Sequence, residues 1–182
     1  MFDLSDLSPA IANLESLFAV AATPEIGQKF LRFQLCPEST ALLPVDGIAA
    51  VISIAVAEIL PVPPMPGCVL GIYNWQGEML WLVDLVHQVG FPSTLRRGNL
   101  STTVMAIVVQ VDGQSLGLVV PQVYDIESHD PQQLQPASTA LFPQKLLPFV
   151  QGYLTCDRST VLDVAAILQD PLLQIHPLNA IH

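Results

Sequence analysis

The feature that most constrains this 182-residue chain is an internal repeat of apolar segments. The offset between the two copies is 75 residues at the first matching strand and 81 and 79 residues at two later points, and small differences in loop length explain the drift. Short strands punctuated by Pro and Gly favour small closed barrels, so the repeat predicts two barrels packed together. The matching positions are Leu43 and Leu118, Gly71 and Gly152, and Asp84 and Asp163.

Each copy of the repeat opens with a predicted β-hairpin. Residues 29–35 alternate apolar and polar side chains, as in a half-buried strand, and residues 41–45 form the returning strand. The signal is sharper in the second copy, where residues 104–111 are apolar except for Gln110 and residues 116–120 return. Asp112-Gly113 lies between these strands and is a strong signal for a two-residue hairpin turn.

A helix is predicted ahead of the repeat, over residues 9–22. A Ser-Pro pair favours its start, and a Thr-Pro pair ends it. Ile11, Leu14 and Phe18 fall on one face of this helix. That apolar stripe has two interpretations: it packs onto the chain's own barrels, or it docks a partner.

The sequence thus divides into an extension, a repeated domain and a tail. Sixteen prolines concentrate between the repeated units, where they are expected to form stiff connectors, with a proline-rich docking motif as the alternative. The predicted boundaries are 1–28 for the N-terminal helical extension, 29–170 for the domain with two interlocked β-barrel subdomains at roughly 29–98 and 99–170, and 171–182 for the C-terminal tail.

Charge and hydropathy exclude some classes of function. Six Lys plus Arg against sixteen Asp plus Glu give a net charge of −10, which opposes binding to a phosphate backbone, so no nucleic-acid partner is expected. The longest nearly apolar run, residues 47–57, is well short of the ~20 residues that a membrane-spanning helix needs. The N-terminus carries acid where a secretory signal carries base. We therefore expect a cytoplasmic protein.

Sequence signatures of catalysis and metal binding are missing. There is no Gly-rich phosphate loop, H-E-x-x-H pair or G-x-S-x-G elbow, and the three cysteines are widely spaced. We expect reduced cysteines, no metal, no cofactor and no catalytic residues. Asp84 and Asp163 each follow an apolar strand and are expected to cap the next helical turn. Gly71 and Gly152 indicate close backbone approach or a bend.

Two large aromatic side chains surround a predicted turn in residues 71–77. Tyr73 and Trp75 belong to types that are common in binding hot spots, although both also occur in cores. Trp75, at the turn, fits an interface and a core equally well. Trp81 lies within an apolar strand, where a core position is the better interpretation.

These segments together resemble the CheW-like domain over roughly Lys29 to Asp170. The resemblance implies two intertwined, five-stranded, SH3-like β barrels with short helices. It also implies a non-catalytic scaffold that bridges receptor tips and the regulatory domain of a CheA-type kinase. The segments that carry the resemblance are Leu43-Pro44 with Ile48 and Val51, then 71–77, 82–85, 117–120 with Val123, and 149–152.

The chain departs from the family pattern at four positions. Gln76 replaces the arginine of the family's N-L-R-G segment, and Trp81 replaces a proline. Pro121 stands at a frequent aspartate, and Ala50 at an acidic position. Losing the arginine removes a charge-assisted contact or a structural hydrogen bond, worth ~1.5–3 kcal/mol. The departures point either to a divergent system, such as pilus-based or light-directed motility, or to altered receptor contacts.

The resemblance also assigns candidate partner surfaces. Val45, Ile48 and Val51, together with the facing second barrel, are the candidate receptor-binding residues, because a helix-in-groove contact needs an apolar lining. The expected partner there is a methyl-accepting chemoreceptor or a photoreceptor-type transducer. The membrane would be reached only through such receptors, at arrays on its inner face.

Tyr73, Trp75 and Gln76 are the candidate residues for contact with a CheA-like histidine kinase or another partner. Core packing or loop stabilisation is the alternative for these three residues and for the receptor candidates. Two other functions stay open. One is a small-ligand-binding β barrel, although no convergent polar set is visible. The other is a CheW-like assembly module with no receptor contact.

Overall fold

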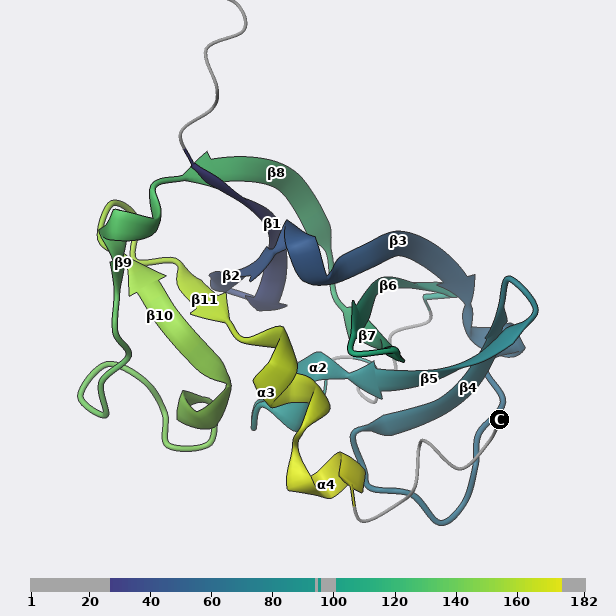
Figure 1. The fold of residues 1–182 in the computed structure, drawn as a ribbon. Coiled ribbons are helices and arrows are strands. Elements are labelled where there is room, and N and C mark those ends of the chain that lie inside the picture. The colour runs from purple at the N-terminus through teal and green to yellow at the C-terminus, as the bar shows by residue number, and fades with distance from the viewer. Residues whose placement is uncertain (1–26, 94, 96–100, 175–182) are drawn as a thin grey trace, which may run out of the picture.

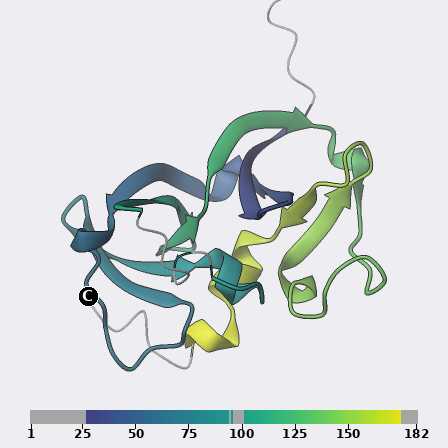
Figure 2. The same ribbon diagram turned by 180° about the vertical axis from the view of Figure 1, so that it is seen from behind.

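The structure is a computed structural model that describes residues 27–93, 95 and 101–174. The chain is mainly β, as predicted: its strands form one six-stranded and one five-stranded sheet, both strongly curved. The two sheets lie side by side with short helices between them (Figures 1 and 2). The pair matches the predicted architecture of two packed barrels, which we name barrel A and barrel B.

Barrel A contains the six-stranded sheet, in the order β8-β1-β2-β11-β10-β9. All of its neighbouring strands are antiparallel except β2 and β11, which are parallel. The sheet has one strand more than the five predicted, and this extra strand, β9, is only two residues long. The strands are β1 (Gln28–Cys36), β2 (Ser39–Pro44), β8 (Val123–His129), β9 (Leu134–Gln135), β10 (Val150–Leu154) and β11 (Thr160–Leu162).

Barrel B contains the five-stranded sheet, in the order β3-β6-β7-β5-β4. Its parallel pair, β5 and β7, corresponds to β11 and β2 of barrel A. The strands are β3 (Ile48–Ala55), β4 (Val69–Trp75), β5 (Glu78–Asp84), β6 (Thr103–Val111) and β7 (Gln114–Val120). The helices are α2 (Leu85–Gln88), α3 (Val164–Leu168), α4 (Pro171–Gln174) and the short 3-10 turns η2 (Val45–Gly47), η3 (Val56–Glu58), η4 (Pro131–Gln133) and η5 (Leu147–Phe149).

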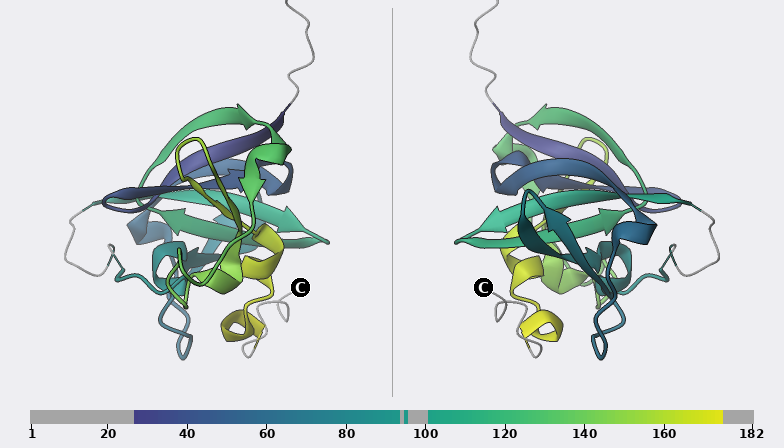
Figure 3. Two further views of the ribbon diagram at one scale, coloured as in Figure 1. Left: turned by 90° about the vertical axis from the view of Figure 1, so that its left-hand side faces the viewer. Right: turned by 90° about the vertical axis from the view of Figure 1, so that its right-hand side faces the viewer.

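Two predicted segments lie wholly or partly outside the described residues. The helix expected over residues 9–22, with its stripe of Ile11, Leu14 and Phe18, is entirely outside them. The tail expected from residue 171 begins with α4, which lies at the end of the molecule opposite β8 (Figures 1 and 3).

Each barrel combines strands from both copies of the repeat. Barrel A joins the first hairpin, β1–β2, to β8, β10 and β11 of the second copy, and barrel B joins β6–β7 to β3, β4 and β5 of the first. The crossing strands β3 and β8 arch between the barrels (Figure 1). The predicted hairpin turn is confirmed, since Asp112 and Gly113 have φ angles of 52° and 78°.

Both sheets curl because the chain runs from a strand at one end of the sheet directly to the strand at the other end. In barrel A, β8 leads through η4 into β9 at the opposite end of the same sheet. In barrel B, β3 leads through η3 to Leu60, which forms a bridge with Ile72 of β4. Gly71 and Gly152 lie at these two closures, where close backbone approach was predicted. A Cβ atom would lie 2.2 Å from the Leu60 oxygen in one case and 2.4 Å from the Gln135 oxygen in the other.

Three apolar clusters stabilise this arrangement. The central core lies between the barrels and includes Leu31 and Leu43 of barrel A with Ile107 and Leu118 of barrel B. Trp81 belongs to it and is 6% exposed, which confirms its predicted core position. Each fully buried aliphatic side chain contributes about 1.5–3 kcal/mol. The barrel B interior contains Ile54, Leu80, Leu82, Val104, Ala106, Val108 and Val119, and the barrel A interior contains Phe30, Leu42, Leu154 and Val161.

Short helices follow the last strand of each repeat and begin with an aspartate cap, as predicted. Asp84 Oδ1 accepts a hydrogen bond from His87 N, and Asp163 Oδ1 accepts one from Ala166 N, both at 3.2 Å. These bonds satisfy backbone N–H groups that the first helical turn leaves without a partner. The two caps confirm the structural interpretation of both aspartates.

Candidate partner-binding surfaces

The three candidate receptor residues share one segment but differ in exposure. Ile48 starts β3 and packs against the central core, and Val45 is half-buried in η2. Val51 is 39% exposed. A β-bulge between Ile48 and Ala50 puts Ile48 opposite Val109 and Val51 opposite Ile107, so the two side chains lie on the same face of β3. β3 is also an end strand of its sheet. Of the three, Val51 is therefore the side chain most available to a partner.

The structure adds two exposed apolar side chains on β8 that the sequence reasoning missed. Tyr124 is 41% and Ile126 is 60% exposed. Ile126 is opposite Leu31 of β1, as Val51 is opposite Ile107 of β6, so Ile126 and Val51 occupy equivalent positions. The signal was available, because the same offset of 75 that relates the first strands also relates these two residues. The two crossing strands therefore present matching exposed apolar positions.

The three candidate kinase residues lie on the β4–β5 hairpin, which projects from barrel B on the side away from barrel A (Figures 1 and 2). Tyr73 and Trp75 are half-buried and pack against the barrel B interior. Gln76 is exposed at the turn, with φ of 53°, and Gly77 follows with φ of 84°. The Asn74 side-chain oxygen accepts a hydrogen bond from Gly77 N at 3.0 Å and fixes the turn. Of the three candidate kinase residues, only Gln76 is exposed enough to contact a partner directly.

One further exposed apolar side chain belongs to this hairpin. Met79 of β5 is 50% exposed and lies opposite Asn74 in the ladder. Sequence reasoning missed it because the alternation in β5 is weak: the strand is buried from Leu80 to Asp84. The projecting tip thus offers Gln76 with Met79 beside it, in place of the predicted aromatic pair.

Barrel A carries a polar network that the sequence did not reveal. Arg32 of β1 donates from Nε to Glu127 Oε1 at 2.5 Å and from Nη2 to Glu127 Oε2 at 2.7 Å. Nη2 also donates to Asp157 Oδ2 at 2.7 Å, and Nη1 donates to Thr40 Oγ1 at 2.8 Å and to Ser159 Oγ at 2.7 Å. Every guanidinium nitrogen therefore has an acceptor.

Charge pairing in this network shifts the pKa values of its members. The hydrogen bond to Glu127 raises the pKa of Arg32, and the same bond lowers the pKa of the Glu127 carboxyl. Burial raises the pKa of Asp157, but hydrogen bonds from Ser159 and Arg32 outweigh it and lower the value to about 2. His129 Nε2 lies 2.8 Å from Glu127 Oε2 and extends the network. The acids are thus held in their charged form.

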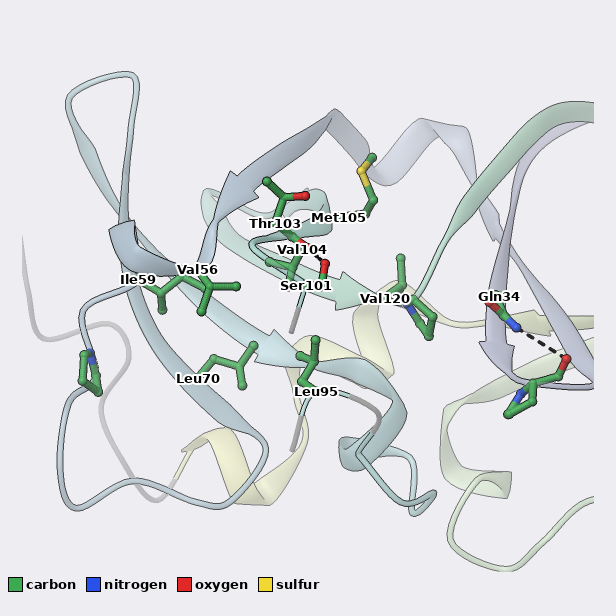
Figure 4. A pocket seen from close by; sticks show the side chains of 13 residues that line it. Gln34, Val56, Ile59, Leu70, Leu95, Ser101, Thr103, Val104, Met105 and Val120 are labelled. Carbon is green, nitrogen blue, oxygen red and sulfur yellow. Dashed lines mark hydrogen bonds between the residues drawn. The ribbon is translucent and has the colours of Figure 1, made fainter. Parts of the chain in front are cut away.

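A largely apolar cavity of about 720 Å³ opens on barrel B and reaches the β1–β2 turn (Figure 4). Val56, Ile59, Leu70 and Val104 line its apolar end. Gln34 lies at the other end, where its side-chain nitrogen is 3.4 Å from the Pro37 oxygen. None of the predicted partner residues lines this cavity.

Within residues 27–93, 95 and 101–174, no three His, Cys, Asp or Glu side chains are grouped so that they could hold a metal ion. Over the same part of the chain, no helix has both the length and the apolar character needed to cross a membrane.

Comparisons with known proteins agree with this fold. The crystal structure of the scaffolding protein TtCheW from Thermoanaerobacter tengcongensis superposes with a TM-score of 0.63 at 24% sequence identity, covering 75% of this chain and 87% of that one. Among curated proteins, none matches the chain. The family described as the CheW-like domain matches residues 29–172, which is most of the sequence and spans both barrels. The chain therefore belongs to the CheW-like domain family.

Proposed function

We propose that this chain is a non-catalytic scaffold that couples methyl-accepting chemoreceptor-like sensors to a CheA-type histidine kinase in bacterial taxis or motility. The observation that carries the proposal is the family match over residues 29–172, which covers the strands of both barrels apart from Gln28, the first residue of β1. A scaffold needs at least two separate contact surfaces, and the crossing strands and the β4–β5 tip supply them. We place the protein in the cytoplasm, at receptor arrays on the inner face of the membrane.

The crossing strands are the proposed receptor surface. Val51 on β3 and its equivalent Ile126 on β8 expose apolar area at matching positions. Apolar side chains at such positions suit the apolar stripe of a receptor helix. Val45 and Ile48 support this surface from η2 and the start of β3, because both are half-buried beside Val51 in the chain.

The β4–β5 tip is the proposed kinase surface. Gln76 supplies amide donors and an acceptor at the turn, and Met79 supplies exposed apolar area. Tyr73 and Trp75 hold the hairpin against the barrel B interior, so their role in binding is indirect. A family arginine at position 76 would add charge, and the glutamine here implies a less acidic partner surface.

Affinity capture of the tagged full chain from lysate of the source cell, read by mass spectrometry, tests both surfaces. We expect a methyl-accepting receptor and a CheA-like kinase among the captured proteins. Val51→Glu is expected to reduce receptor recovery at least tenfold. Its control, Leu141→Glu, alters a side chain that is 58% exposed in the loop before η5 and leaves recovery unchanged. Equal losses for both variants would contradict the receptor surface.

The kinase surface is tested with Gln76→Ala, which is expected to lower kinase recovery and leave receptor recovery unchanged. Gln114→Ala is the matched control, because Gln114 is exposed beside the turn of the β6–β7 hairpin. Capture of a kinase without any receptor would instead support the assembly module without receptor contact. Capture of neither partner would remove the coupling proposal.

The cavity of about 720 Å³ is the observation that keeps a small-ligand-binding barrel as the second candidate. Its lining is apolar at Val56, Ile59 and Leu70, which suits a small hydrophobic molecule. Solvent extraction of purified full-length protein, followed by mass spectrometry, distinguishes the two functions. A stoichiometric co-purified compound supports ligand binding, and its absence supports the scaffold.

A further inference from the structure

The interior of barrel A carries a charged side chain where barrel B carries an aliphatic one. Strand register identifies the equivalent positions. Arg32 is opposite Leu42 in the β1–β2 hairpin, and Val108 is opposite Gly117 in the β6–β7 hairpin. Because residues 42 and 117 are separated by the repeat offset of 75, Arg32 and Val108 occupy the same position in the two barrels.

The same register argument extends to three more positions. β8 pairs with β1 as β3 pairs with β6, and β11 pairs with β2 as β5 pairs with β7. In each case the barrel A residue is polar and the barrel B residue is aliphatic. The four equivalent pairs are Arg32 and Val108, Glu127 and Ile52, His129 and Ile54, and Ser159 and Leu80.

The four aliphatic side chains pack inside barrel B, whereas the four polar side chains form hydrogen bonds inside barrel A. Val108, Ile54 and Leu80 are at most 2% exposed within barrel B, and Ile52 packs against them. In barrel A the four polar side chains hydrogen-bond within one network that includes Thr40 and Asp157. Arg32 belongs to the first half of the sequence, whereas both of its carboxylate partners belong to the second. The network therefore exists only when unlike halves pair.

Chain connectivity limits which other pairing could compete. Within one half, β3 could take the place of β8 only by lying on the far side of β1, parallel to β2. The connection would then have to run the length of a six-residue strand, about 20 Å, whereas the three residues of η2 span about 11 Å at most. The competing arrangement is therefore intermolecular, with the β1–β2 hairpin of one copy joined to β3, β4 and β5 of a second copy.

Such pairing of like halves would place Arg32 against Ile52, Ile54 and Leu80 of the other copy. A cation buried among aliphatic side chains without a counter-ion is strongly unfavourable, and the second-half acids would be unpaired in the same way. We infer that the Arg32 network prevents a second copy of this chain from exchanging like halves, and so directs strand exchange into a single chain. This inference does not depend on the proposed function.

The test replaces the network in the full-length protein with the residues that barrel B uses. The fourfold variant is Arg32→Val, Glu127→Ile, His129→Ile and Ser159→Leu. Refolded from urea over a hundredfold range of protein concentration and measured by size exclusion with light scattering, it is expected to form a dimer fraction at least ten times that of the wild type. Ile52→Val with Ile54→Val is the control, since it disturbs the barrel B interior without adding or removing charge.

Engineered disulfides report which halves have paired, after Cys36, Cys68 and Cys156 have been replaced by alanine. Lys29 is opposite Ser128 in the native ladder, and Ser53 is the repeat equivalent of Ser128. Lys29→Cys with Ser128→Cys therefore forms an intrachain bond when unlike halves pair. Lys29→Cys with Ser53→Cys forms an interchain bond only when like halves pair.

We expect the 29–128 bond alone in the otherwise native chain, and interchain 29–53 bonds in the fourfold variant. The double variant Arg32→Val with Glu127→Ile is measured in parallel and replaces the fourfold variant if that one does not refold. A variant that stays monomeric at every concentration and forms no 29–53 bond overturns the inference. Interchain 29–53 bonds in the otherwise native chain overturn it as well.

Discussion

Asp84 and Asp163 cap equivalent helices with the same geometry, but only Asp84 is buried and bound by a second side chain. Asp84 is 2% exposed, and its Oδ2 accepts a hydrogen bond from the Ser93 hydroxyl. Asp163 is half-buried and caps α3 alone. The backbone N–H groups of the two residues also donate to equivalent carbonyls, of Cys68 and Phe149, each at 2.8 Å.

The two aspartates are therefore expected to differ in their contribution to stability. Asp163→Ala removes one cap, which costs about 1 kcal/mol. Asp84→Ala also leaves the buried Ser93 hydroxyl without its acceptor, which adds about 1–3 kcal/mol. Urea unfolding at pH 7 measures both changes. Equal losses would contradict the second role of Asp84.

Barrel closure gives a second prediction. Gly71 has φ of 145°, and its Cβ would meet backbone atoms of Leu60, so Gly71→Ala is expected to cost about 3 kcal/mol through overpacking and backbone strain. Gly113 also has positive φ, at 78°, but open space surrounds its Cβ position. Gly113→Ala isolates the conformational cost, about 1 kcal/mol. The difference in urea midpoint between the two variants reports the steric part, and equal midpoints would argue against it.

Acid sensitivity gives a third prediction. The pKa of Asp157 falls from its ordinary 3.8 to about 2 in the folded chain, so the unfolded state binds this proton more tightly. The stabilisation is present above about pH 4 and is lost as the pH falls toward 2. The lowered pKa of Glu127 acts in the same direction.

Asp157→Asn is accordingly expected to unfold at lower urea than the wild type at pH 7, with a smaller decline in midpoint between pH 5 and pH 3. Glu38→Gln removes one negative charge from the exposed β1–β2 turn and serves as the control. An unchanged pH profile for Asp157→Asn, measured by urea unfolding at half-unit pH intervals, would contradict the role given to the network.

Thiol accessibility gives a fourth prediction. Cys156 is exposed, Cys36 is half-buried and Cys68 is 4% exposed. In native protein at pH 8, a thiol reagent such as DTNB is expected to modify Cys156 first and Cys36 more slowly. Cys68 should react only at the rate of unfolding. A fast third thiol in native protein would contradict the buried position of Cys68.

Local features were predictable from the sequence because they depend on neighbouring residues. The Asp112-Gly113 turn and the aspartate caps each need only a few consecutive residues, and both are confirmed. The repeat itself predicted two barrels. The face of Val51 was less predictable, because a β-bulge between Ile48 and Ala50 interrupts the simple alternation of β3 and leaves Ile48 and Val51 on one face.

The choice of strand partners was not predictable in the same way. Alternation identifies β1 and β8 as strands, but it does not state that β8 pairs with β1. The network that accompanies this pairing joins Arg32 to Glu127 and Asp157, which are 95 and 125 residues away in sequence. The half-buried position of Trp75 was unpredictable for the same reason, because only the packed barrel shows which side of the β4–β5 hairpin faces the barrel interior.

Strand exchange has a consequence for how the molecule responds to binding. Neither barrel consists of a contiguous stretch of sequence, because β3 and β8 each leave one barrel to complete the other. Unfolding one barrel removes strands from its neighbour, so the two are expected to melt in a single cooperative transition. A partner that contacts only one barrel therefore raises the melting temperature of both, and the scaffold stiffens as a whole wherever it is held.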